Sequence, residues 1–189
     1  IAVASILLLV TSPVLLISGI LIKLGDGGPI FYSQIRTGYA NQLFTIRKLR
    51  TMRIDAELNG VQWSRRTDTR VTNIGKLLRR IRIDELPQLV SVINGTMSLI
   101  GPRPERPEFD QELENVIPFY RLRYSIKPGL SGWAQVNYPY GSSIQDSANK
   151  LSYDLYYLRH CSFWLDLLIL IKTFKLVTNA DGSFSPSEE

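Results

Sequence analysis

The first 22 residues contain no charged side chain and are rich in Leu, Ile and Val. As a helix they would span about 33 Å at about 1.5 Å per residue, enough to cross the hydrocarbon core of a bilayer. The alternative, a helix buried in a soluble core, is less favoured at this length. No basic stretch precedes the run, which argues against a signal peptide. Because the chain begins with Ile, we expect a processed or truncated start. We predict membrane insertion.

Pro13 follows Ser12 at the middle of this apolar segment. Proline removes a backbone hydrogen bond and crowds the preceding turn, so a kink is expected there. The pattern predicts a bent membrane helix over residues 1–24 and leaves open whether it crosses or turns back. Basic residues from Lys23 to Arg53 follow the helix, so the positive-inside rule predicts a cytoplasmic globular part.

The composition indicates one folded domain with an anionic partner. The 189 residues are 44% hydrophobic and 21% charged, which fits a globular protein. The net charge of +5 favours nucleic acid, a phosphorylated ligand or an anionic membrane surface. A single cysteine, Cys161, excludes an intrachain disulfide, and a single histidine excludes a histidine-rich metal site.

The remaining sequence is mainly helical in its periodicity. Residues 29–36 and 43–50 flank a turn and predict a β-hairpin. Residues 163–177 are expected to form an amphipathic helix at the membrane interface, or else a core helix. Apolar residues recur at helical spacing in three further segments: 74–82, 85–93 and 143–159.

These patterns together predict an α+β fold that is predominantly helical. We expect an N-terminal kinked membrane helix over residues 1–24, a small β-hairpin and amphipathic interfacial helices. Residues 25–178 would form one cytoplasmic domain, and residues 179–189 a flexible tail.

Two adjacent carboxylates, Asp84 and Glu85, stand behind three arginines in the run RRIRIDELP at residues 79–87. In isolation, Asp84 is interpreted as a helix N-cap and Glu85 as a charge favoured by the helix dipole. With the arginines alongside, the pair could bind a phosphate and a divalent cation together. Neighbouring helical residues point in different directions, so one carboxylate could face a substrate phosphorus while the other holds metal.

Two loops rich in proline and glycine could carry ligand contacts. Arg103 lies between two prolines in GPRP at residues 101–104, which predicts a stiff platform for bidentate phosphate binding or a surface turn. Residues 127–137, KPGLSGWAQVN, form a constrained loop that either binds ligand or serves packing. Three more basic residues on or beside the hairpin could contact phosphate or form a solvated face: Arg36, Lys48 and Arg50.

Taken in order, these motifs resemble the bacterial sugar transferase family of polyprenyl-phosphate phosphoglycosyl transferases. The likeness covers about residues 1–178. It rests on the apolar segment with Ser12-Pro13, GPIFYSQIRTG at 28–38, FTIRKLRTM at 44–52, Asp84-Glu85, MSLIGPRP at 97–104, GLSGWAQVN at 129–137, LYY at 155–157 and LDL at 165–167.

The resemblance implies a monotopic protein of the bacterial inner membrane. The helix would be re-entrant at Ser12 and Pro13, with both ends and the catalytic domain on the cytoplasmic face. Asp84 is implied as the nucleophile, with Glu85 as its dyad partner and both carboxylates holding Mg²⁺. Asp84 would attack a nucleotide diphosphate-sugar, expected to be a UDP-hexose, and release nucleoside monophosphate.

The resulting phosphosugar-aspartate would pass its phosphosugar to polyprenyl (undecaprenyl) phosphate and so initiate polysaccharide or glycoconjugate assembly. The residues expected to bind the phosphates or the substrate are Arg79, Arg103, Lys48, Arg50, Arg36 and Gln34. Membrane lipids are expected partners and nucleic acid is not.

Three features depart from the family pattern or narrow it. The basic lead-in before the apolar segment is absent. Residues 138–141, YPYG, stand where small family members often place a phosphate-binding arginine. Residues 104–109, PERPEF, are similar to the exopolysaccharide branch, whose members often carry an additional N-terminal membrane region.

Two other readings remain. An ordinary membrane-associated glycosyltransferase would release nucleoside diphosphate and typically use an Asp-x-Asp motif, which this sequence lacks. A membrane-tethered protein that binds nucleic acid or another anion would explain the positive charge, with strongly salt-dependent binding that ignores Asp84. The sugar, the nucleotide and the oligomeric state stay open.

Overall fold

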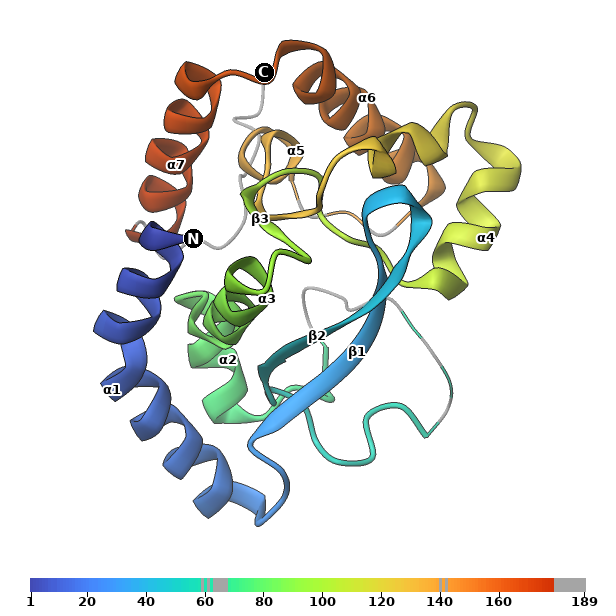
Figure 1. Ribbon diagram of the computed structural model, residues 1–189. Helices are drawn as coiled ribbons and strands as arrows, with labels where there is room; N and C mark the ends of the chain where they lie inside the picture. The colour runs from blue at the N-terminus through green and yellow to red at the C-terminus, as the bar shows by residue number, and fades with distance from the viewer. Residues whose placement is uncertain (59, 61, 63–67, 140, 142, 179–189) are drawn as a thin grey trace, which may run out of the picture.

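The computed structural model describes residues 1–189 except 59, 61, 63–67, 140, 142 and 179–189. The predicted flexible tail therefore lies outside the described residues. Figure 1 shows the first helix, α1 (Ala2–Asp26), and the last, α7 (Phe163–Thr178), along the same side of the molecule. The hairpin and α4 (Pro107–Val116) lie on the other side in this view.

Helix α1 is continuous, with Pro13 inside it, and follows a curved course in Figure 1. Pro13 has no N–H to donate to the carbonyl of Leu9, four residues before it. The hydroxyl of Ser12 donates to that carbonyl instead, at 2.7 Å. The helix ends at Gly27, whose φ of 70° allows its N–H to donate to Lys23 O at 3.0 Å. The Ser12 hydroxyl thus gives Leu9 O a donor where Pro13 supplies none. The kink expected at Ser12 and Pro13 stays a prediction.

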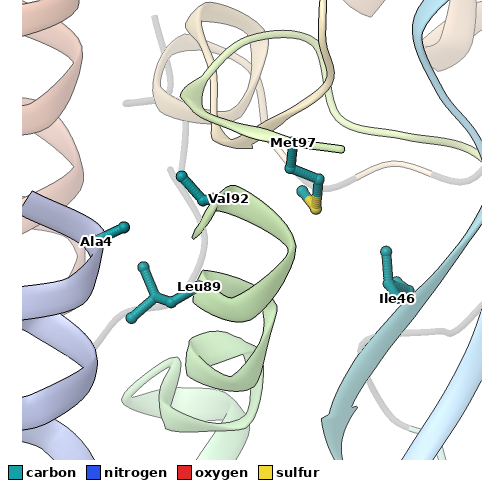
Figure 2. Close-up of a cluster of buried hydrophobic side chains, with 5 residues drawn as sticks. All are labelled: Ala4, Ile46, Leu89, Val92 and Met97. Carbon is teal, nitrogen blue, oxygen red and sulfur yellow. The ribbon is translucent and has the colours of Figure 1, made fainter. Parts of the chain in front are cut away.

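Only a narrow face of α1 is covered by the rest of the protein. Figure 2 shows Ala4 facing Leu89 and Val92 of α3 (Leu89–Ile93), with Met97 and Ile46 completing the cluster. Outward-facing side chains such as Leu9 and Leu24 are 75% and 78% exposed. Within the described part of the chain, α1 alone is long and apolar enough to span a membrane, with a mean hydropathy of 2.5 and 17% of its apolar window buried.

The predicted hairpin is confirmed. Strands β1 (Phe31–Thr37) and β2 (Leu43–Leu49) pair antiparallel through the short helix η1 (Tyr39–Asn41). The register sets Tyr32 opposite Lys48 and Arg36 opposite Phe44. Because side chains alternate along a strand, the even-numbered residues share one face. Buried Ile46 lies on this face and belongs to the core cluster with Leu89 and Met97, so this face is turned toward the core.

The predicted helices 74–82 and 85–93 appear in modified form. Helix α2 (Asn73–Arg80) begins at Thr72, whose hydroxyl accepts from the Gly75 N–H at 3.0 Å. The second segment is divided into a 3₁₀ helix, η2 (Ile83–Gln88), and a short helix, α3 (Leu89–Ile93). Pro87 lies in η2 and cannot donate the hydrogen bond that an α-helix would require there.

The C-terminal half contains several short elements that the periodicity did not predict. Strand β3 (Ser98–Ile100) pairs parallel with β4 (Gly129–Ser131). Helices α4 and η3 (Tyr120–Ser125) lie between the two strands in sequence, and α5 (Trp133–Asn137) follows β4. The predicted helix 143–159 is confirmed as α6 (Ile144–His160), which opens with a capping box of Ser143 and Asp146.

Helix α7 confirms the helix predicted at residues 163–177. Ile169 is fully buried, whereas Phe163, Trp164 and Phe174 are 73%, 75% and 72% exposed. Together with the outer face of α1, α7 leaves a broad apolar surface on the side of the molecule where both helices lie (Figure 1).

The loops around β3 and β4 meet backbone to backbone. A side-chain carbon at Gly101 would lie 2.5 Å from Lys127 O, and one at Gly129 or Gly132 would collide with the backbone of Gly101. Only glycine fits at these three positions. The contact joins the segment that carries Arg103 to the loop that leads into α5.

Candidate active site

Asp84 lies in η2 and is only 6% exposed. Arg82 precedes the helix with a φ of 57°, an unusual conformation for a residue with a side chain. In the described structure, the buried Oδ1 of Asp84 has no hydrogen-bond partner. The predicted N-cap role is wrong, because Asp84 lies inside η2 and Arg82 occupies the N-cap position. Strained backbone and an orphaned carboxylate oxygen are typical of functional sites.

Burial raises the pKa of Asp84 to about 6, and the neighbouring charge of Glu85 adds to the rise. The positive charges of Lys48, Arg79 and Arg82 oppose it. At neutral pH the carboxylate is mostly ionised and is surrounded by cations. Such a group is a nucleophile that needs no general base.

Glu85 is bound by Arg103 through both guanidinium ends. Arg103 Nη1 donates to Oε2 at 3.3 Å and Nη2 donates to Oε1. Arg82 Nη1 lies 3.9 Å from Oε2. Burial alone would raise the pKa of Glu85, but the charge and hydrogen bonds of Arg103 lower it to about 2. Glu85 therefore fixes Arg103 beside Asp84.

The hairpin contributes a second group of polar residues. Burial lowers the pKa of Lys48 to about 8, and the charge of Arg36 lowers it further. The charges of Glu85 and Asp84 act in the opposite direction. Its Nζ lies 5.4 Å from the ring centre of Tyr32. Arg36 donates to Pro104 O at 3.0 Å and to Oε1 of Gln34. Arg36 thus connects the hairpin to the segment that carries Arg103.

Two other predicted phosphate ligands have separate partners. Arg79 Nε donates to Thr51 Oγ1 at 2.8 Å, and its charge also acts on Asp84. Arg50 is 6% exposed, donates to Pro29 O at 2.6 Å and pairs with Asp26 at the end of α1. The structure therefore gathers the predicted residues Arg79, Arg103, Lys48, Arg36 and Gln34 at or next to the Asp84–Glu85 pair, and places Arg50 at the end of α1.

Several features of the site were not predicted from the sequence. Arg82 is one of the three arginines noted beside Asp84 and Glu85, and it approaches both carboxylates, but its positive φ has no local sequence signal. Tyr32 donates to Glu57 at 2.9 Å, and Glu57 also accepts from Arg106 at 2.8 Å. Behind Arg103 lies a buried arginine, Arg123. The contacts of Tyr32 with Glu57 and of Arg123 with Arg103 join residues that are distant in sequence, so no short motif contains them.

The two carboxylates of the site are the groups that could hold Mg²⁺. In the described residues no group of three His, Cys, Asp or Glu side chains could form a metal cage. Mg²⁺ is commonly held by one or two carboxylates together with substrate phosphates and water. The uncommitted Oδ1 of Asp84, beside Glu85, fits that kind of site.

The family model described as bacterial sugar transferase matches residues 1–180. The chain belongs to this family. This bacterial sugar transferase is 44% identical over 172 residues to the UDP-N-acetylgalactosamine-undecaprenyl-phosphate N-acetylgalactosaminephosphotransferase of Aeromonas hydrophila. It is 41% identical over 175 residues to the undecaprenyl-phosphate glucose phosphotransferase of Komagataeibacter xylinus.

These alignments cover most of this chain but less of its relatives. They include 91% and 89% of this chain, but only 41% and 33% of the two relatives. A UDP-glucose:undecaprenyl-phosphate glucose-1-phosphate transferase of Caulobacter vibrioides is 37% identical over 183 residues, which is 96% of this chain and 68% of that protein. The transferase described here thus corresponds to a part of the longer relatives.

Proposed function

We propose that this chain is the catalytic part of a phosphoglycosyl transferase. It would move a sugar 1-phosphate from a nucleotide diphosphate-sugar, a UDP-hexose in our proposal, to undecaprenyl phosphate and release nucleoside monophosphate. The observation that carries the proposal is the buried Asp84 carboxylate, with an uncommitted oxygen among cations of three chain segments. The printed names of the relatives, which specify sugar phosphotransferases acting on undecaprenyl phosphate, support the same reaction class.

The first step is attack by a carboxylate oxygen of Asp84 on the sugar-linked phosphorus. A bond from that oxygen to phosphorus forms, the bond from phosphorus to the bridging oxygen breaks, and nucleoside monophosphate leaves with the electron pair. Because Asp84 is nearly closed to solvent, its side chain has to turn toward the bound diphosphate. Its pKa of about 6 leaves it mainly ionised at pH 7.5, so no base is needed.

In the second step, an oxygen of undecaprenyl phosphate attacks the same phosphorus. The aspartyl oxygen–phosphorus bond breaks, which restores the Asp84 carboxylate and yields undecaprenyl diphosphate-sugar. Both nucleophiles are anions that approach an anionic phosphate, so the main obstacle is charge repulsion. Lys48, Arg79 and Arg103 lie around the Asp84–Glu85 pair and would stabilise the phosphate oxygens.

Mg²⁺ belongs to the proposal as the cofactor. Asp84 and Glu85 are the carboxylates that would hold it, and it would neutralise charge on the diphosphate. Glu85 is already bound by Arg103, so its second role is to keep that guanidinium in place. In this proposal the attack on phosphorus is made by Asp84, and the basic residues bind and orient the diphosphate.

We also propose that α1 is re-entrant in the cytoplasmic membrane and that the remainder of the chain lies on the cytoplasmic face. The exposed apolar sides of α1 and α7 support contact with lipid. The Ser12 hydroxyl supports a bend within lipid, since it satisfies the carbonyl that Pro13 leaves without a backbone donor. Lipids, undecaprenyl phosphate and the nucleotide-sugar are the proposed partners.

The test is to identify the released nucleotide. Detergent-solubilised protein is incubated with Mg²⁺, undecaprenyl phosphate and a panel of UDP-sugars, and intact mass spectrometry follows the protein when the acceptor is omitted. We expect nucleoside monophosphate and a phosphosugar adduct, both absent from Asp84→Asn. Exposed Asp55→Asn is the matched control and should retain both. Release of nucleoside diphosphate would instead indicate an ordinary glycosyltransferase.

A further inference from the structure

The backbone of the segment that carries Arg103 is held by four successive carbonyl groups. Pro102 O accepts from the Gly129 N–H at 2.9 Å, and Glu105 O accepts from the Thr37 N–H at 3.0 Å. Between them, Pro104 O accepts from Arg36 at 3.0 Å and Arg103 O accepts from Arg123 at 2.9 Å. Because proline has no N–H, this Pro-Arg-Pro segment can be fastened to other elements mainly through its acceptors.

Arg123 differs from the other donors because its charge is buried. It lies in η3 and is 7% exposed, and its partner Asp154 in α6 is 2% exposed. Arg123 Nη2 lies 2.8 Å from Asp154 Oδ2, and Nη1 donates to the Tyr120 hydroxyl at 2.7 Å. The rings of Tyr120 and Tyr124 lie 5.2 and 5.7 Å from the guanidinium carbon. The guanidinium is thereby enclosed and fixed in direction.

A buried ion pair is a poor device for stability alone. Removing two charges from water has a large cost, and packed apolar residues often stabilise a core equally well. What an apolar pair could not do is donate a directed hydrogen bond to Arg103 O. The cluster therefore combines a buried guanidinium, a fixed orientation and an acceptor that belongs to the backbone of an active-site residue.

We propose that Arg123 is a positioning residue for the phosphosugar transfer. Held by Asp154 and Tyr120, it fixes the carbonyl of Arg103 and so directs the Arg103 guanidinium toward Glu85 and the substrate phosphate. The proposal rests on the proposed function. It adds residues of η3 and α6 that do not contact the substrate but determine the position of the Arg103 guanidinium.

Arg123→Lys is the first variant, because lysine keeps the charge but lacks the planar fork that reaches Arg103 O, Asp154 and Tyr120 together. We expect kcat/KM for nucleotide release to fall roughly 10- to 100-fold, the range for a misplaced active-site group. In an Arg103→Ala background there is no guanidinium to direct, so we expect Arg123→Lys to change kcat/KM by less than about 3-fold.

The matched control is Tyr124→Phe. It removes another buried hydrogen bond of η3, from the Tyr124 hydroxyl to Asp110, and leaves the ring beside Arg123. We expect its melting temperature to fall as far as that of Arg123→Lys while kcat/KM stays within about 3-fold of the parent. Circular dichroism confirms that each variant is folded before its rates are compared.

Two outcomes would overturn the proposal: the same loss from Arg123→Lys in both Arg103 backgrounds, or an equal loss from Tyr124→Phe. Either would make Arg123 a stability residue. The failure of the proposed function has a different signature, because the nucleotide released by the parent protein would then be a diphosphate. In that case kcat/KM for diphosphate release is compared among the parent, Arg123→Lys, Arg103→Ala and the double variant, and it tests the role of Arg123 in the same way. If the parent releases no nucleotide, both proposals are overturned.

Discussion

Asp84 and Glu85 are adjacent in the chain, yet the protein shifts their pKa values in opposite directions. Burial raises that of Asp84 to about 6, and Arg103 lowers that of Glu85 to about 2. The difference arises from their partners: Glu85 receives a two-ended guanidinium, whereas Oδ1 of Asp84 receives no hydrogen bond in the described structure. Two neighbouring carboxylates whose pKa values are shifted apart are suited to different chemical roles.

The opposite shifts predict opposite effects on stability in metal-free buffer. The raised pKa of Asp84 means that its charge destabilises the fold as pH rises from about 3.8 through about 6. Asp84→Asn should therefore be more stable than the parent at pH 8, by roughly 3 kcal/mol, since the pKa rises by about two units and one unit is about 1.4 kcal/mol. The gain should vanish near pH 4. Thermal unfolding with chelator present measures both.

Glu85→Gln is the opposite case. The lowered pKa of Glu85 contributes stability that is present above about 4.5 and lost as pH falls toward about 2. We expect Glu85→Gln to lower stability at pH 8 by about 1 kcal/mol or more, because Arg103 loses a charged partner. If both substitutions shift the melting temperature in the same direction, the assignment of the two environments is wrong.

Arg50 was predicted from its motif as a phosphate ligand, but in the structure it binds residues at the end of α1. Its contacts to Asp26 and Pro29 fasten the end of α1. We expect Arg50→Lys to lower the melting temperature, because lysine cannot reproduce the two-ended contact, while the KM for UDP-sugar stays unchanged. A matched Arg103→Lys variant should raise KM or lower kcat. An increase in KM for Arg50→Lys would restore it as a phosphate ligand.

The glycine contacts predict a steep difference between two Gly→Ala changes. Gly129→Ala places a carbon against the backbone of Gly101, so we expect little folded protein. Gly25→Ala is the control, since its new carbon would lie 3.6 Å from Ile74 in ordinary contact. Alanine favours a helix over glycine by about 1 kcal/mol, so Gly25→Ala should be neutral or stabilising. Yield of folded protein and melting temperature distinguish them, and a well-folded Gly129→Ala would contradict the packing described.

Ser12→Ala should destabilise α1 in a lipid environment by about 1 kcal/mol. It leaves Leu9 O without the hydroxyl that replaces the missing Pro13 donor. Thr11→Ala is the matched control, because the Thr11 hydroxyl donates to Leu7 O. In an α-helix that carbonyl also has a backbone donor, the N–H of Thr11, so it keeps a partner when the hydroxyl is removed. Unfolding in nanodiscs should rank Ser12→Ala below Thr11→Ala, and equal values would remove the special role of Ser12.

Local patterns predicted the long elements, and long-range contacts determined the rest. The uncharged run, the two hairpin strands and α6 are long enough for their composition or their hydrophobic periodicity to be recognised in the sequence. Strands β3 and β4 have three residues each, and their pairing joins segments about thirty residues apart in sequence, so no window contains it. Residues 85–93 were predicted as one helix, but the structure divides this segment into a 3₁₀ helix that contains Pro87 and a short α-helix.

The same distinction applies to the site. Asp84, Glu85 and Arg103 lie in short motifs and were identified from them. Arg123 and Asp154 were not, because composition rules expect charged residues at the surface and these two are buried together from separate helices. Their importance becomes visible only when the carbonyl of Arg103 is traced to its donor.

The backbone contact of Gly101 with Gly129 and Gly132 leaves no room for a side chain at any of the three positions. This junction cannot gain volume, so it is a poor place for substitutions that aim to change the proposed donor specificity. An engineer seeking a new donor would leave the three glycines alone and diversify the loops that open onto solvent. Grafting the Arg103 segment into another scaffold would require transplanting its glycine-bearing partner loop as well.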